Sequence, residues 1–192
     1  MSNLVGKHVL LFFSAEHFPQ SVTFLPKLIE TYNELKQNSK EFEVVFVSCD
    51  RDLTKFSDHY AKMPWLALPY DDRRSIFLKR WFDIKEHPRV VVIGPSGRTM
   101  TTEALYLISI HGAKAFPFDE AHLLGLRNEF TTISKRWPKI CQSKRKHEHL
   151  LRLAFKEVYE CSVCSQYGIC WCYNCEVCDL YLHPRCVFEC KE

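Results

Sequence analysis

The cysteines near the end of the chain have the clearest chemical potential in the sequence. The protein has ten cysteines, and eight of them lie between Cys161 and Cys190. Two pairs with a two-residue spacing are followed by a histidine and a further cysteine: Cys161-x2-Cys164, then Cys175-x2-Cys178-x4-His183-x2-Cys186. Both thiolates of such a pair can bind one ion, and an imidazole supplies another corner of a tetrahedral zinc site. The spacing therefore predicts bound zinc in this segment.

Zinc binding and disulfide bonding are the two chemistries that this cysteine pattern allows. Disulfides are typical of secreted proteins, and the sequence shows no secretory signal peptide, so zinc is favoured. A tail of about 45 residues buries too little apolar surface to fold unaided, so the metal is expected to be structural. A catalytic ion would need an open coordination position and a nearby base, and neither Glu148 nor Glu176 has a distinctive position for that role.

A second region of interest lies near the start of the chain, where the pattern predicts a strand, a loop and a helix. The apolar run from Leu10 to Phe13 is predicted as a buried strand, and the segment from about Val22 to Lys36 as an amphipathic helix. The helix has one apolar face, formed by Phe24, Leu25, Leu28, Ile29, Tyr32 and Leu35. Further buried strands are predicted at 44–48 and 90–93.

Cys49 is the only cysteine inside this core pattern. It falls near the carboxyl end of a predicted strand, the edge where α/β proteins place their sites. A single thiol without a resolving partner is a poor exchange catalyst, so a packing role is the simpler interpretation. Arg51 and Asp52 follow it, and Asp52 is expected at the N-terminus of a helix near 53–61.

The order of these elements resembles a thioredoxin-like domain of the nucleoredoxin and tryparedoxin type. The motifs that carry the resemblance are the loop at 14–21, the helix proline Pro26, the strand exit at 44–52, the segment Met63-Pro64-Trp65-Leu66-Ala67-Leu68-Pro69-Tyr70, and His87-Pro88 before the strand at 90–93. The resemblance extends from roughly Gly6 to Arg127. It implies an α/β fold, a thioredoxin-like three-layer sandwich, followed by a small zinc-stabilised domain.

The active-site loop of that family is altered here. In the family the helix begins with Trp-Cys-Pro-Pro-Cys, whereas this chain has His17-Phe18-Pro19-Gln20-Ser21. Disulfide exchange needs one thiolate to attack a disulfide and a second thiol to resolve the intermediate, and Phe18 and Ser21 provide neither. An unactivated serine is scarcely ionised at neutral pH, so Ser21 is expected to cap the helix. We expect no catalytic residue in this loop, and only Cys49 remains as a lone thiol.

The resemblance also implies a surface for partner proteins. It predicts a cis peptide bond between His87 and Pro88, which exposes backbone to an extended peptide. The alternative is a proline that simply opens a buried strand, and the sequence leaves both open. Trp65 has the same ambiguity, between a partner contact and core packing.

The cysteine-rich tail resembles the divergent C1-type zinc domain that plant nucleoredoxins carry after their last thioredoxin-like module. The motifs are His147-Glu148-His149-Leu150, Tyr159, Trp171-Cys172-Tyr173 and Tyr181-Leu182-His183-Pro184-Arg185-Cys186. The resemblance implies two interleaved sites, and hence about two structural zinc ions. One set of ligands is Cys161, Cys164, His183 and Cys186; the other is His149, Cys175, Cys178 and a fourth group.

The fourth group of the second site stays open. A full C1 pattern places its last cysteine farther downstream than Cys190, so either Cys190 or His147 is expected to complete the site. Cys170 and Cys172 fall outside the spacing and are expected to be free thiols.

Domain limits are predicted from these motifs and from charge. We expect the thioredoxin-like domain at 1–130, a basic linker at 131–146 and the C1-type domain at 147–192. The basic residues of the linker have three interpretations: a solvated segment without a specific role, a nuclear localisation signal, or a patch that binds an acidic partner. The short segment before the first strand suggests a shortened sheet edge, or a chain derived from part of a longer multi-module protein.

Proteins are the expected partners, and the expected location is the cytoplasm, the nucleus or both. The formal net charge of +3 falls to about +1 once two zinc sites of three thiolates each are counted, too little to favour nucleic acid. No apolar segment long enough to span a membrane is apparent. Lipid is disfavoured, because the sequence between Cys164 and Cys175 does not resemble a lipid-binding C1 groove.

Two functional classes remain. The first is a non-catalytic protein-binding or redox-regulatory module with structural zinc. The second is a protein-disulfide oxidoreductase, as the family resemblance implies, that works through Cys49, Cys170 or Cys172. The missing dithiol favours the first.

Overall fold

The structure, a computed structural model, describes residues 4–142 and 147–188. It forms two compact units that divide between Asp119 and Glu120, and each is described by itself. Residues 131–134 and 140–142, inside the predicted linker, belong to a helix and a strand of the second unit, α5 and β6. The domain limits at 130 and 146 stay predictions.

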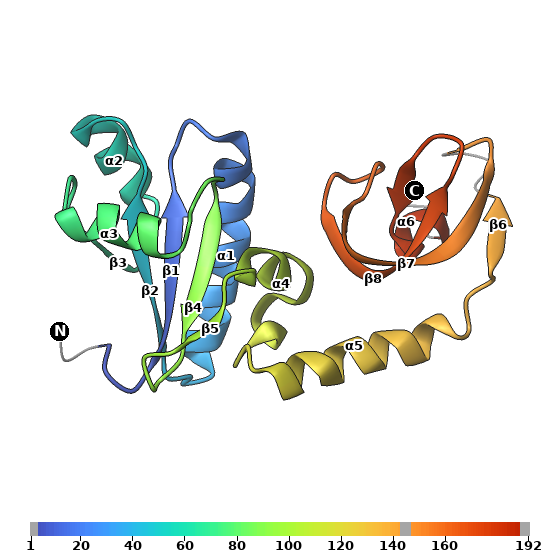
Figure 1. The fold of residues 1–192 in the computed structure, drawn as a ribbon, viewed down its shortest axis with the longest axis horizontal. Coiled ribbons are helices and arrows are strands. Elements are labelled where there is room, and N and C mark those ends of the chain that lie inside the picture. Colours follow the sequence, from blue (N-terminus) through green and yellow to red (C-terminus); the bar gives the residue numbers. More distant parts are fainter. Residues whose placement is uncertain (1–3, 143–146, 189–192) are drawn as a thin grey trace. The chain divides into compact units, whose positions relative to one another are not determined.

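A mixed five-stranded sheet is the centre of the first unit (Figure 1). Its strands are β1 (His8–Ser14), β2 (Phe42–Ser48), β3 (Leu66–Ala67), β4 (Arg89–Ile93) and β5 (Thr99–Thr101), in the order β3-β2-β1-β4-β5. β1 and β2 are parallel and β1 and β4 antiparallel. The three central strands are buried almost throughout, which explains their continuous apolar runs, because both faces of the sheet are covered.

Helices cover the two faces of this sheet in the predicted three-layer arrangement. They are α1 (Pro19–Gln37), α2 (Leu53–Tyr60), α3 (Arg73–Trp81), α4 (Ala104–His111) and the 3-10 turn η1 (Gly112–Ala115). Phe12 packs against Phe24 of α1, while its strand neighbour Phe46 packs against Phe56 of α2. Phe13 points to the opposite face, where Phe82 after α3 contacts it. Alternation along the strands thus divides one apolar run between two core layers.

The start of α1 corrects two sequence predictions. The helix begins at Pro19 rather than near Val22, and its N-cap is Phe18 rather than Ser21. Proline suits the first helical position, because its fixed φ matches the helix and its missing N–H would have no partner there. Ser21 consequently lies within the first turn, fully buried. At α2 the expectation is confirmed: Asp52 accepts a hydrogen bond from the Lys55 N–H at 2.8 Å.

The second unit is a small antiparallel sheet with two helices. After α5 (Glu120–Ser134) come β6 (Ile140–Gln142), β7 (Leu150–Glu160), β8 (Tyr167–Cys175), β9 (Leu180–Leu182) and α6 (Pro184–Phe188), with the strands in sequence order. Its core cluster consists of Leu151, Cys161, Tyr173, Cys175 and Leu182. Trp171 Nε1 donates to Thr131 Oγ1 at 3.3 Å and joins β8 to α5. Two of the five buried core residues are cysteines, so this core is small without a metal.

Among residues 4–142 and 147–188, no helix has the length and apolar character needed to cross a membrane.

Candidate functional site

The first Cys/His cluster brings together the four residues predicted to share an ion. The ligand atoms of Cys161, Cys164, His183 and Cys186 all lie within 4.8 Å of one another. The two-residue knuckle of Cys161 and Cys164 follows β7, while His183 follows β9 and Cys186 lies in α6. His183 Nδ1 is 3.3 Å from the sulfur of Cys164. Residues far apart in the sequence therefore form one compact donor set.

Hydrogen bonds prepare this cluster for a cation. His183 Nε2 is 3.1 Å from the Tyr167 carbonyl, which can only accept, so Nε2–H donates and leaves the Nδ1 lone pair facing the sulfurs. Burial lowers the pKa of His183, which favours the neutral imidazole that a metal requires. Burial by itself would raise the pKa of the Cys161 thiol. Hydrogen bonds from the backbone N–H groups of His183 and of the Cys161–Cys164 knuckle outweigh burial, and the pKa of this thiol is lowered.

Gly168 of β8 is a packing requirement of the first cluster. A Cβ at this position would lie 2.7 Å from His183 Nε2 and even closer to the Tyr159 ring. We expect Gly168→Ala to destabilise the second unit by about 1–3 kcal/mol and to weaken metal retention, because both rings must move. Thermal unfolding and zinc content measure the two effects. Gly125→Ala in α5 is the control, since no atom lies within 4 Å of its Cβ position, and an equal loss there would contradict the packing argument.

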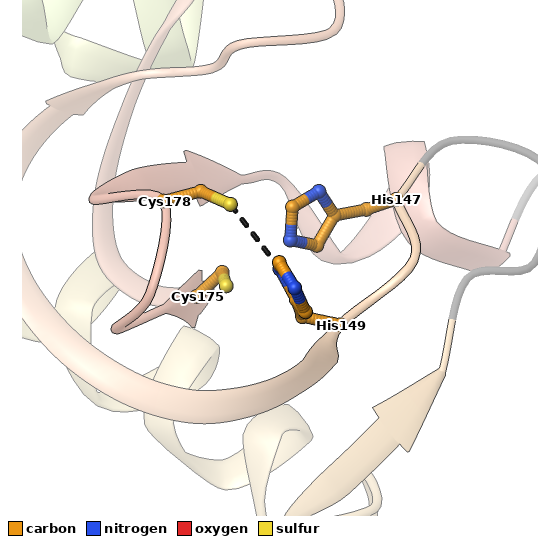
Figure 2. A group of neighbouring side chains, drawn as sticks. All are labelled: His147, His149, Cys175 and Cys178. Atoms are coloured by element: carbon orange, nitrogen blue, oxygen red, sulfur yellow. Dashed lines mark hydrogen bonds between the residues drawn. The ribbon is translucent and has the colours of Figure 1, made fainter.

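The second cluster consists of His147, His149, Cys175 and Cys178 (Figure 2). Cys175 ends β8 and Cys178 lies in the turn before β9, whereas both histidines precede β7. His149 Nδ1 is 3.2 Å from the sulfur of Cys178. Cys175 is buried, but Cys178 and His149 are exposed, so this cluster is more open to solvent than the first. Cys190, the other predicted candidate for the fourth ligand, lies outside the described residues.

In the thioredoxin-like unit, the altered loop and the predicted partner edge lie against each other. The His87–Pro88 peptide bond is cis, as the resemblance implied. The Phe18 ring lies between two imidazoles, with its centroid 4.1 Å from that of His17 and 5.1 Å from that of His87. Burial, followed by the charges of Lys79 and His17, lowers the pKa of His87. A cluster of three tilted rings thus lies at the start of α1.

The remaining predicted residues of this unit differ in exposure. Trp65 is only 4% exposed and packs against Phe12 and Tyr32, so its ring belongs to the core. Cys49 is half-buried beside the core cluster of β1, β2 and β4, and burial raises the pKa of its thiol. Ser21 Oγ has no hydrogen-bond partner among the residues described, and its fully buried position keeps it from substrate.

A buried polar pair beside the altered loop was missed in the sequence. The Asp50 carboxylate, with a fully buried side chain, accepts from the Glu16 N–H at 2.8 Å and lies 3.4 Å from His59 Nδ1. Burial opposes its ionisation, but hydrogen bonds from His59, Glu16 and Ser48 outweigh burial and lower the pKa of Asp50. These contacts tie the loop to the end of β2 and to α2. An acidic residue two positions after the end of a buried strand was the only sequence signal.

Comparison with known proteins agrees with both parts of this description. The chain matches the family described as Thioredoxin-like over residues 6–99 and the C1 domain family over residues 145–187. Together with the fold and the Cys/His clusters, these matches define a thioredoxin-like protein with a C1 domain. The chain belongs to the nucleoredoxin family, and its matches to plant members run through both domains.

Three relatives illustrate the extent of the similarity. "Probable nucleoredoxin 1" and "Probable nucleoredoxin 3" of Arabidopsis thaliana are 41% and 39% identical, each over 98% of this chain. The chain spans 33% of the first relative and 48% of the second. Among solved structures, tryparedoxin II from C. fasciculata is 40% identical with a TM-score of 0.58, over 64% of this chain and 83% of that one.

Proposed function

We propose that this chain is a nucleoredoxin-type module that binds proteins or regulates their redox state without exchanging disulfides itself. The observation that carries the proposal is the pair Phe18 and Ser21 at the N-terminus of α1, where the family resemblance expects the two active-site thiols. Disulfide exchange cannot take place at this position, because no thiolate is there to attack a disulfide and no second thiol is there to resolve the mixed disulfide.

Protein partners are supported by the surface around the altered loop. His17 is exposed and Phe18 and His87 are half-buried, so part of this aromatic surface is available to a partner peptide, whereas Pro88 itself is buried. The proposed location is the cytoplasm, the nucleus or both. Because the chain spans only a third to a half of its plant relatives, the activity of any longer protein is part of the same proposal.

We include structural zinc, about two ions, in this proposal. The donors fit the metal: each cluster combines thiols with imidazoles, the set that zinc prefers, and His183 already has the tautomer that a ligand needs. The ions would join the loops of the C1 domain and supply much of its folding free energy.

The alternative is disulfide exchange through cysteines outside the loop. Burial raises the pKa of Cys49, Cys170 and Cys172, the last to about 11, so little reactive thiolate is present at neutral pH. Cys170 and Cys172 are also fully buried. These features support the non-catalytic function over the alternative.

The test is turnover of a model protein disulfide by the zinc-loaded wild-type chain, with thioredoxin reductase and NADPH, or a dithiol, as reductant. We expect no turnover above background, because the loop has no thiol. Sustained turnover would overturn the proposal, and its loss in Cys49→Ser would then identify the thiol that has taken over.

A further inference from the structure

The four described residues of the second cluster surround a common space. Both sulfurs and both imidazoles face this space in Figure 2, and their ligand atoms lie within 4.8 Å of one another. In tetrahedral zinc sites, bonds of about 2.0–2.3 Å put neighbouring ligand atoms about 3.3–3.8 Å apart. Small side-chain movements would therefore close the cluster around one ion.

His147 has an unmet bonding requirement in this arrangement. Its Nε2 atom is buried and has no hydrogen-bond partner in the described part of the chain. A buried polar nitrogen without a partner is costly, and a metal ion would satisfy it. The His147 and His149 rings meet edge to face, with centroids 5.3 Å apart and an interplanar angle of 70°, so they are not stacked on each other.

The placement of the two histidines agrees with shared coordination. His147 and His149 lie at a bend directly before β7, and both imidazoles belong to the same cluster of ligand atoms. The Glu148 carbonyl accepts a hydrogen bond from Gln142 Nε2 at 3.3 Å, which links this segment to β6. The segment therefore presents both imidazoles to the Cys175–Cys178 knuckle.

We propose that His147 is the fourth ligand of the second zinc site and that Cys190 is not a ligand. This inference rests on the metal binding proposed above and specifies its chemistry. A zinc ion held by two thiolates and two imidazoles is neutral, whereas the site with Cys161, Cys164, His183 and Cys186 has a charge of −1. With both ions bound, the formal net charge of +3 becomes about +2 rather than about +1.

Zinc content of the full chain, measured after dialysis against a moderate chelator, tests the proposal. We expect the wild type and Cys190→Ser to retain about two ions, and His147→Ala to retain about one, because loss of a direct ligand should weaken the second site by more than about 100-fold. Retention of both ions by His147→Ala, or loss of one by Cys190→Ser, would overturn the assignment. A wild type that binds no zinc would instead refute the proposed metal binding.

A second variant separates coordination from folding. His147→Cys keeps a zinc ligand at this position, so it should restore the second ion if His147→Ala loses it through missing coordination. Cobalt substitution gives an independent readout, since the thiolate-to-cobalt absorption should increase in His147→Cys and stay unchanged in Cys190→Ser. If His147→Cys retains only one ion, or the cobalt spectrum of Cys190→Ser loses thiolate absorption, the assignment is wrong.

Discussion

Replacing Phe18 and Ser21 together with cysteine is expected to create protein-disulfide reductase activity at least about 100-fold above that of the wild type. Phe18 is the N-cap of α1, so a thiolate there would lie at the positive end of the helix dipole. The dipole stabilises the thiolate and lowers the pKa of its thiol. A thiol at position 21, three residues on, would be the resolving group, and it fits because cysteine is close to serine in size.

The single variants Phe18→Cys and Ser21→Cys are the controls for this experiment. The first should form a mixed disulfide with substrate but turn over poorly, and the second should stay inactive because a buried thiol cannot begin the exchange. Loss of the Phe18 ring also exposes the His87 ring. The single variant Phe18→Cys measures the effect of that exposure separately. A folded double variant without activity would show that the loop has lost the geometry of its family as well as its thiols.

Removal of zinc is expected to unfold the second unit and leave the sheet of β1 to β5 intact. Structural zinc contributes about 10–16 kcal/mol of binding free energy in small zinc domains, as much as the total stability of many domains. Without metal, the core around Leu151, Tyr173 and Leu182 is too small to compensate. Hydrogen exchange after chelation should therefore show lost protection in β7 and β8 but not in β1 and β2.

Two controls support the interpretation of the zinc experiment. Adding zinc back should restore the protection of β7 and β8, provided that the thiols have been kept reduced. Cys161→Ser should lose protection without any chelator, because it removes a ligand of the first cluster. If β7 and β8 stay protected in chain shown to contain no metal, then zinc is not what stabilises this unit.

Much of the fold and of the metal chemistry was accessible from the sequence. Apolar runs predicted β1, β2 and β4, because strands buried on both faces need apolar residues at every position. The knuckle Cys161-x2-Cys164 predicted a metal site, because two residues of spacing are enough to aim both thiols at one ion. The lack of thiols at Phe18 and Ser21 is likewise a property of residue type alone.

Other features depend on residues that are distant in sequence, and only the tertiary structure decided them. Ser21 was expected to cap α1, but Pro19 starts the helix earlier and burial in the first turn takes the hydroxyl out of reach. The pairing of Asp50 with His59 needs α2 to fold back onto the end of β2. The sequence left the fourth ligand of the second site open between His147 and Cys190, and only the folded chain brings His147, just before β7, to the knuckle after β8. The physical reason is the same in each case: local spacing sets what a short segment can present, whereas packing decides which segments meet.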